Sequence, residues 1–293
     1  MRKRIRKKTN TKSFFAKNNL AVVISLILLF VSLVLIAVKA VSNDKYSSNT
    51  RAVGYKPKPA KKIDYVISGR DASAGEYPFM VTLYYRQPFS TKKPDLYSQH
   101  FCGGVLINKD WVLTAAHCAN TYRRSNIGVA FNVLNLKDEV DKSNLRTVSK
   151  LIPHEDYDPK YNTVNPNDIA LIKLNKSYTG VNPIRLNSDD ISVYGKSGTI
   201  LGWGYVSSSS QKSEILQEGD ITYDYYSDTS VLTSSTLTRP QSYDSGGPLL
   251  AKIGNAFYSV GVINQTVNRG TDSYYANVSA FIDWIEEKTD LEF

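Results

Sequence analysis

From residue 66 onward the chain consists of short runs rich in β-branched and aromatic residues, and this pattern constrains its fold more than any other feature. Clusters of Gly, Pro, Asn, Asp and Ser separate the runs and favour turns. Several runs alternate with a period of two, as Val129–Val133 does. The clearest runs are Phe79–Tyr85, Val105–Ile107, Trp111–Thr114, Ile127–Leu134, Ile169–Leu174, Thr199–Leu201, Asp220–Tyr225 and Ala256–Ile263. The pattern predicts an all-β barrel or sandwich.

One convincing amphipathic helix is predicted, at the C-terminus. In the stretch VSAFIDWIEEK the apolar residues recur at helical spacing, and they are Val278, Phe281, Ile282, Trp284 and Ile285. We therefore expect many strands followed by one terminal helix.

The charge of the chain is unevenly distributed. The 293 residues carry a formal net charge of +9, but residues 1–65 hold 15 basic and 2 acidic residues, and residues 66–293 carry a net charge of −4. A protein that binds nucleic acid needs a basic face, so no nucleic-acid partner is expected for the folded part. The apolar fraction of 42% excludes an intrinsically disordered chain.

The N-terminus has the composition of a membrane-targeting segment. Residues 1–19 carry eight basic side chains and no acid, and Leu20–Val38 runs for 19 residues without a charge. A helix of this length spans about 28 Å, close to the thickness of a bilayer core. The basic flank favours a cytoplasmic N-terminus and an exported C-terminus.

Two interpretations of residues 20–41 remain open. They form an uncleaved signal anchor or a secretory signal peptide cut after Ala40. The apolar run exceeds the roughly 7–15 residues of most cleavable signals, which favours the anchor. The protein is then held at the cell membrane with the part after residue 41 outside, or it is secreted. Residues 42–65 follow as a linker or propeptide, extended by its Pro and Lys residues.

Three motifs carry residues suited to nucleophilic catalysis. His117 lies in TAAHC, Asp168 in NDIAL and Ser245 in DSGGP. A hydroxyl is a weak nucleophile, so an imidazole must take its proton, and a carboxylate fixes the imidazole tautomer. Glycines beside the serine let backbone N–H groups approach an oxyanion.

In these motifs and their order, the chain resembles the trypsin-like (chymotrypsin-fold) serine peptidases. The resemblance covers about residues 66–293 and includes VISG at 66–69, HFCGG at 100–104 and GWG at 202–204. It implies two six-stranded antiparallel β-barrels with a C-terminal helix, here preceded by an N-terminal transmembrane or signal helix. It also implies a serine endopeptidase that hydrolyses a protein or peptide substrate through an acyl-enzyme.

The resemblance assigns the catalytic roles. His117, Asp168 and Ser245 would form the catalytic triad, and the backbone N–H groups of Ser245 and Tyr243 would form the oxyanion hole. Most relatives have Gly at the position of Tyr243, so here a bulky residue has to present the N–H group.

The resemblance also implies a zymogen. The chain would be cut between Tyr65 and Val66, and the new amino group of Val66 would pair with Asp244 inside the protein.

Cys102 and Cys118 are the only cysteines, and the resemblance pairs them in a disulfide. The exported topology permits such a bond. A metal site is the alternative, but two Cys and three scattered His give no ligand spacing. No metal and no organic cofactor are expected.

The specificity pocket of the family maps onto Arg239, Asn264, Thr266 and Ser273. Arg239 stands six residues before the nucleophile, at the base of the pocket, where trypsin-type enzymes have an acid. A preference for Lys or Arg is therefore not supported, and we expect Glu or Asp on the acyl side of the cleaved bond.

Two functions of other classes stay open. One is a catalytically weak or inactive binding module on the same scaffold at the cell surface, which Tyr243 favours and the intact triad opposes. The other is a membrane-surface structural protein with an incidental protease fold.

Overall fold

The computed structural model describes the chain from residue 69 onward, with short gaps. The described residues are 69–160, 165–189, 193, 195–206, 211–226, 229–235, 238–267 and 272–293. The chain divides into two compact units, Met1–Pro59 and Ala60–Phe293, and every described residue belongs to the second. The expected N-terminal helix, the linker and Val66 lie outside the described residues. Within the described ranges no helix is long and apolar enough to span a bilayer.

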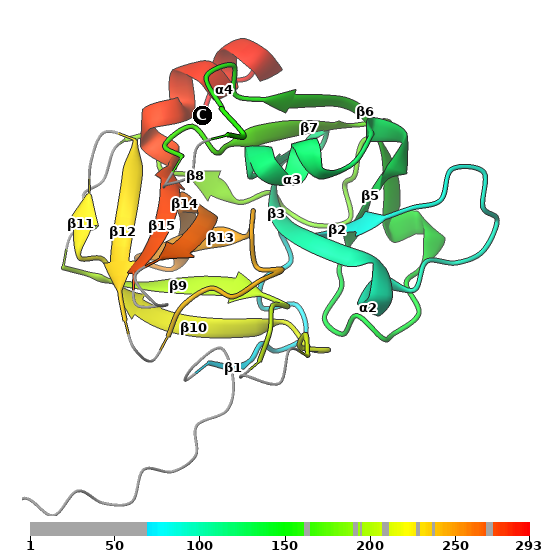
Figure 1. Ribbon diagram of the computed structural model, residues 1–293, viewed down its shortest axis with the longest axis horizontal. Helices are drawn as coiled ribbons and strands as arrows, with labels where there is room; N and C mark the ends of the chain where they lie inside the picture. The colour runs from blue at the N-terminus through cyan, green and yellow to red at the C-terminus, as the bar shows by residue number, and fades with distance from the viewer. Residues whose placement is uncertain are drawn as a thin grey trace, which may run out of the picture. The chain divides into compact units, whose positions relative to one another are not determined.

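Six strands of the second unit close into a barrel, as the sequence resemblance implies (Figure 1). Their antiparallel order is β2-β3-β4-β7-β6-β5. They are β2 Met80–Tyr85, β3 His100–Asn108, β4 Trp111–Thr114, β5 Ile127–Phe131, β6 Leu145–Pro153 and β7 Ala170–Leu174. Strand β5 ends before the expected Leu134, because Asn132 adopts a left-handed φ of 54° that breaks the ladder.

Nine strands form a second sheet. Its path is β1-β10-β9-β13-β14-β15-β12-β11, and β8 pairs with β14 in parallel. The strands are β1 Arg70–Asp71, β8 Arg185–Leu186, β9 Ser197–Gly202, β10 Gln217–Thr222, β11 Tyr225–Tyr226, β12 Ser230–Ser234, β13 Pro248–Ile253, β14 Ala256–Val267 and β15 Asp272–Asn277. The all-β prediction is confirmed. The second six-stranded barrel is seen only as this larger sheet, which the two-residue strands β1, β8 and β11 extend.

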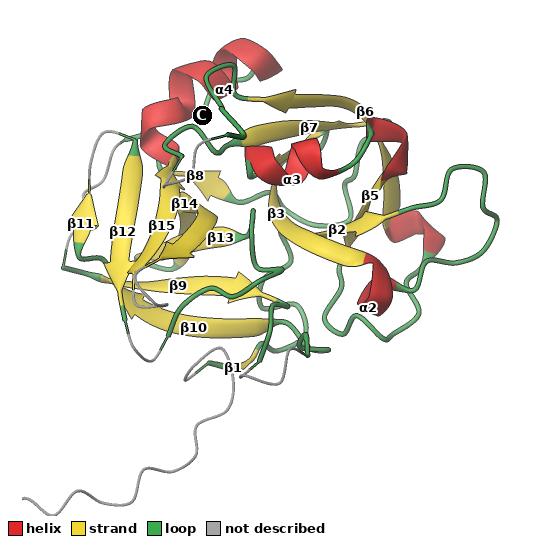
Figure 2. Cartoon of the chain, viewed as in Figure 1, coloured by secondary structure: helices red, strands yellow, loops and turns green. Residues whose placement is uncertain are grey.

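The C-terminal helix lies where the apolar spacing predicts it (Figure 2). It starts as the 3-10 turn η4, Val278–Phe281, which the side chain of Asn277 caps, and continues as α4, Ile282–Thr289. Ile285 of α4 is fully buried. The remaining helices within the described ranges are short: α2 Leu96–Gln99, α3 Ala116–Thr121, and the 3-10 turns η1 Arg124–Asn126 and η2 Lys142–Asn144.

Backbone hydrogen bonds join the barrel to the nine-stranded sheet at the turn that carries Ser245. The N–H of Gly103 in β3 donates to the Ser245 carbonyl at 2.8 Å. On the other side, the N–H of Gly246 donates to the carbonyl of Ile263 in β14 at 2.9 Å. The turn is thus held by both halves of the unit.

Candidate active site

His117 lies in the first turn of α3, directly after β4, and contacts Asp168. The carboxylate of Asp168 accepts from the backbone N–H of His117 at 2.8 Å and from its ring Nδ1 at 2.6 Å. The side chain of Asp168 is 3% exposed, whereas that of His117 is 34% exposed. An ionised carboxylate only accepts hydrogen bonds, so Nδ1 donates to Asp168, and in the neutral form of the ring Nε2 then holds the lone pair.

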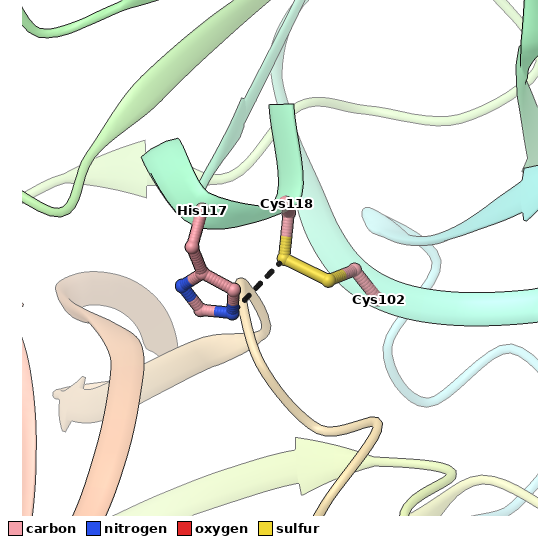
Figure 3. A group of neighbouring side chains, drawn as sticks. All are labelled: Cys102, His117 and Cys118. Atoms are coloured by element: carbon pink, nitrogen blue, oxygen red, sulfur yellow. Dashed lines mark hydrogen bonds between the residues drawn. A yellow bond between two sulfur atoms is a disulfide. The ribbon is translucent and has the colours of Figure 1, made fainter. Parts of the chain in front are cut away.

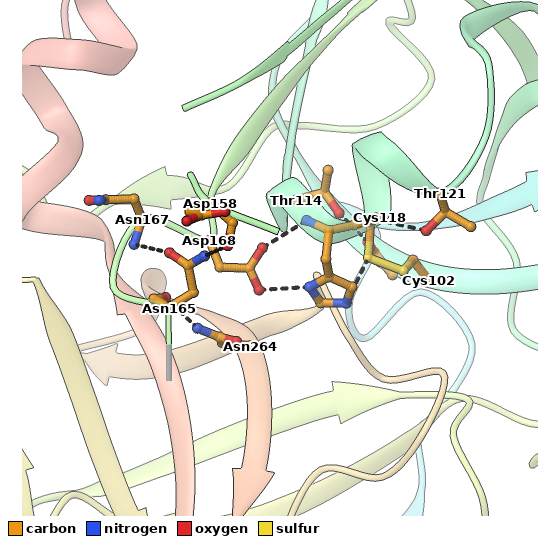
Figure 4. Close-up of polar contacts among 11 residues, drawn as sticks. Cys102, Thr114, Cys118, Thr121, Asp158, Asn165, Asn167, Asp168 and Asn264 are labelled. Atoms are coloured by element: carbon orange, nitrogen blue, oxygen red, sulfur yellow. Dashed lines mark hydrogen bonds and ion pairs between the residues drawn. A yellow bond between two sulfur atoms is a disulfide. The ribbon is translucent and has the colours of Figure 1, made fainter. Parts of the chain in front are cut away.

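Asparagines hold the loop that precedes Asp168 (Figure 4). Asn165 donates to the carbonyl of Asp158 at 2.8 Å, and its side-chain oxygen accepts from the N–H of Asn167 at 3.2 Å. The backbone carbonyl of Asn165 accepts from the side chain of Asn264 in β14 at 2.7 Å. This last bond ties a barrel loop to the nine-stranded sheet, so the carboxylate's position depends on both halves.

Ser245 lies in a tight turn that only glycine can complete. Gly246 has φ +76°, and a Cβ there would overlap the hydroxyl of Thr114 and the carbonyl of Gly103. The same Cβ would lie 3.1 Å from the N of Ala115, two residues before His117. The DSGGP motif therefore lets the nucleophile turn pack directly against the start of α3.

Ser245 and His117, both in the described part of the chain, are not joined by a hydrogen bond. Nε2 of His117 instead lies 3.5 Å from Sγ of Cys118 (Figure 3). Catalytic hydrogen bonds are often long before substrate is bound. The structure thus brings His117 and Asp168 into contact and places Ser245 on the adjacent turn.

Asp244 is buried beneath the nucleophile turn. Its carboxylate accepts from the N–H of Gly204 at 2.6 Å and from the N–H of Gln241 at 2.8 Å. Burial raises the pKa of Asp244 to about 7. A Cβ on Gly202 or Gly204 would overlap this carboxylate, which explains the GWG motif physically.

Tyr243 adopts the left-handed backbone conformation that glycine usually provides. Its φ is +81°, and such a conformation costs about 1–3 kcal/mol in a residue with a side chain. The ring meets Tyr205 edge-on with centroids 5.1 Å apart, and Nζ of Lys212 lies 4.6 Å from the ring centre. A hydrogen bond with Tyr205 raises the pKa of Tyr243. The Tyr243 carbonyl is held by Nε2 of His100 at 3.2 Å.

His100 and Lys212 form a continuous support beneath Tyr243. Burial, with the nearby charge of Lys212, lowers the pKa of His100 to about 3, so the ring is neutral. Since Nε2 donates to Tyr243, Nδ1 accepts from the hydroxyl of Thr82 at 2.5 Å. Lys212 donates to the His100 carbonyl at 3.1 Å and also lies 5.4 Å from the ring centre of Tyr97.

Comparison with known proteins gives the site its context. The profile of the Trypsin family matches residues 66–285. The chain belongs to the trypsin family of serine peptidases. Human granzyme H is 31% identical over 247 residues, 78% of this chain and 92% of that protein. Rat granzyme B is 29% identical over 248 residues, 78% of this chain and 93% of that protein, and mouse granzyme B(G,H) is 29% identical over 245 residues.

The predicted disulfide of this serine peptidase is confirmed. Cys102 of β3 and Cys118 of α3 are bonded, with their Cα atoms 6.2 Å apart (Figure 3). Their sulfurs and the His117 ring lie within 4.8 Å of one another. Since a metal site would need thiolates, the bond withdraws both sulfurs as ligands.

The proposed specificity residues of the peptidase lie in different surroundings. Arg239 is half-buried and Ser273 is fully buried on β15. The side chain of Asn264 is committed to the Asn165 carbonyl, and the side chain of Thr266 lies outside the described residues. A cleft of about 240 Å³ runs beside His117 and includes Asn264 in its wall.

Sequence reasoning missed the residues that support Tyr243. His100 stands in the HFCGG stretch, but nothing in that stretch indicates that its buried ring supports Tyr243. Lys212 lies in a segment with no motif, and Tyr205 follows the GWG motif without being part of it, so the sequence carries no signal for their contact with Tyr243.

Proposed function

We propose that this serine peptidase is an exported endopeptidase that cleaves through an acyl-enzyme on Ser245. The contact between His117 and Asp168 carries the proposal, because it leaves the unprotonated Nε2 as the general base. The Ser245 hydroxyl gives its proton to Nε2 and attacks the scissile carbonyl carbon. The resulting His117 cation then protonates the leaving amine, and water repeats the sequence on the acyl-enzyme.

The oxyanion would be stabilised by the N–H groups of Ser245 and Tyr243. The positive φ of Tyr243 supports this role, because it is the backbone conformation that a glycine would supply at that position. Losing one such donor costs about 10²–10³ in rate.

A fluorophosphonate probe tests the proposal directly. We expect covalent labelling of the wild type after the proposed cut before Val66, and no labelling of Ser245→Ala. A weakly active or inactive binding module is the second candidate, favoured by the position of His117 Nε2 at Cys118 rather than at Ser245. Absence of labelling in folded, cut protein would support that candidate.

We propose activation by a cut between Tyr65 and Val66. The burial of Asp244 supports it, because a buried carboxylate with a pKa near 7 gains most from a new ammonium partner. Asp244→Asn should fold but lose most activity. Fully active protein whose N-terminal sequence begins before Val66 would contradict the proposal.

We propose a preference for Glu or Asp on the acyl side of the cleaved bond. The position of Arg239 in the family register and its half-buried side chain support it. Peptides that differ only at this position should show a Glu preference in the wild type that Arg239→Ala loses. Equal cleavage of Glu and neutral peptides by the wild type would contradict it.

Export and membrane attachment also stay proposals, supported by the apolar run Leu20–Val38. Protease protection of cells that express the chain should show residues after 41 outside the membrane. The mass of the purified protein then separates an anchor from a signal cut after Ala40.

A further inference from the structure

A groove of about 910 Å³ lies on the barrel and shares no residue with the cleft at His117. We call it the basic groove, because six cationic side chains line it: Arg86, Lys92, Lys93, Lys142, Arg146 and Lys176. Asp95 is the one acidic residue in its lining. Residues 66–293 together carry a net charge of −4, so this basic surface is a local exception within a mildly acidic part of the chain.

The cations of the basic groove differ in what they contact. Arg146 donates to several backbone carbonyls, including that of Ser177, and so braces the wall. Lys93 is paired with Glu139 at 2.5 Å. In the described part of the chain, the ammonium groups of Lys92, Lys142 and Lys176 make no ion pair or hydrogen bond, and all three residues are exposed. Three cations are thus available to a ligand.

An exposed aromatic ring stands in the loop that forms one rim. Phe89 is 99% exposed and has a φ of +70°. Among the described residues only Phe89 and Tyr122 are exposed large hydrophobic side chains. Exposed aromatic anchors beside charged rims are typical of protein–protein contacts.

A polypeptide fits this combination better than other polyanions. Single-stranded nucleic acid is bound on series of stacked aromatic rings, and Tyr84, the aromatic residue in the lining, is 5% exposed. A sulfated polysaccharide has charge but no apolar side chain for Phe89. Anchoring at a lipid surface uses an extended apolar face, whereas this rim offers one ring.

We infer that the basic groove binds an acidic segment of a protein substrate that carries an apolar side chain. Its carboxylates would meet Lys92, Lys142 and Lys176, and the apolar side chain would contact Phe89. This inference rests on the proposed function only in taking the bound protein as a substrate. The groove would raise the local concentration of chosen proteins without taking part in the chemistry.

The test measures binding without catalysis, on the full chain carrying Ser245→Ala. The probe is a short fluorescent peptide of Asp and Glu with one central Leu. Removing the three free lysines together (Lys92→Ser, Lys142→Ser, Lys176→Ser) should weaken binding about tenfold or more, the order expected from losing three exposed charge pairs. The matched control removes three exposed lysines outside the groove: Lys109→Ser, Lys150→Ser and Lys252→Ser. An unchanged thermal midpoint shows that each variant is folded.

The contribution of Phe89 is tested by combining one substitution in the protein with one in the peptide. Phe89→Ala should weaken binding of the peptide that contains Leu. It should leave unchanged the binding of a peptide with Ser in place of Leu. The inference would be overturned if the groove variant and the control variant bound the peptide equally well. It would also be overturned if the three lysines bound dextran sulfate or anionic vesicles but did not bind the peptide. A Ser245→Ala protein that binds the peptide while wild type labels with no fluorophosphonate would sink the proposed function and leave the groove intact.

Discussion

At the scale of single residues, Tyr243 is the most unusual position in the turn that contains Ser245. A left-handed tyrosine is strained, and such strain persists only where the surroundings hold it. Three side chains from elsewhere in the chain do so: Tyr205 and Lys212 at the ring and His100 at the carbonyl. A position that costs a glycine nothing is therefore maintained here by tertiary contacts.

We expect Lys212→Met to lower kcat about tenfold with little change in KM. This loss is smaller than the one that follows from deleting an oxyanion donor. The cation over the Tyr243 ring and its bond to His100 are lost, so the turn spends less time in the active conformation. Lys212→Arg, which keeps the charge, should recover most of the rate. In a Tyr243→Gly background Lys212→Met should have no effect, and an equal loss in both backgrounds would contradict the explanation.

The buried carboxylate of Asp244 makes the uncut chain sensitive to pH. Its folded pKa is raised to about 7, whereas in the unfolded chain an Asp releases its proton near pH 4. Between these values the folded state binds more protons, so the free energy of unfolding falls as pH rises from about 4 to about 7, by roughly 4 kcal/mol. Above pH 7 this group adds no further change.

Urea denaturation of uncut Ser245→Ala protein at several pH values checks this, with Ser245→Ala/Asp244→Asn as the reference. Asn does not titrate, so the difference between the two proteins isolates Asp244. A difference that stays constant from pH 4 to pH 7 would show that the carboxyl does not gain a proton on folding.

At the scale of elements, the disulfide fixes α3 to β3. It spans 16 residues of sequence and buries both Cys side chains next to His117. Replacing both residues, Cys102→Ala with Cys118→Ala, should lower the free energy of unfolding by about 3 kcal/mol, the loop-closure value for such a span. Denaturant unfolding measures this, and adding reductant to wild type should reproduce the loss. No change on reduction would contradict the prediction.

At the scale of the whole folded unit, the turn that contains Ser245 lies where the barrel meets the nine-stranded sheet, a boundary called the seam here. Gly103 of β3 lies against it: a Cβ there would be 3.1 Å from Cα of Gly247 and 2.9 Å from the side chain of Met80. Neighbouring Gly104 faces barrel residues instead: a Cβ on Gly104 would lie 3.0 Å from the carbonyl oxygen of Leu113. Gly103 therefore probes the seam together with the barrel, whereas Gly104 probes the barrel alone.

We expect Gly103→Ala and Gly104→Ala each to cost about 1–3 kcal/mol of stability through overpacking. Gly103→Ala should also reduce kcat more than tenfold, since it displaces the turn of Ser245, and such displacements near a reacting atom are costly. Thermal unfolding and steady-state kinetics on the two variants check both effects. Equal kcat values for the two variants would show that the seam does not position the nucleophile.

The sequence by itself determined the class of fold and the motifs that identify the family. Strand-length apolar runs between turn residues identify the all-β unit, and the spacing from Val278 to Ile285 identifies the terminal helix. These patterns can be recognised in the sequence because they depend on residues that are close together in the chain. The short motifs around His117, Asp168 and Ser245 are recognisable too, because the residues of each motif are consecutive in the chain.

Only the tertiary structure decided how distant segments meet. It joined β9 to β15 with short edge strands into a nine-stranded sheet rather than a second six-stranded barrel. It also placed Lys212 and Tyr205 on Tyr243, and gathered loop 86–95 and residues 142–147 around the basic groove. Contacts of this kind depend on packing between segments far apart in sequence, and a cation–ring or lysine–lysine approach leaves no periodicity or motif in the chain.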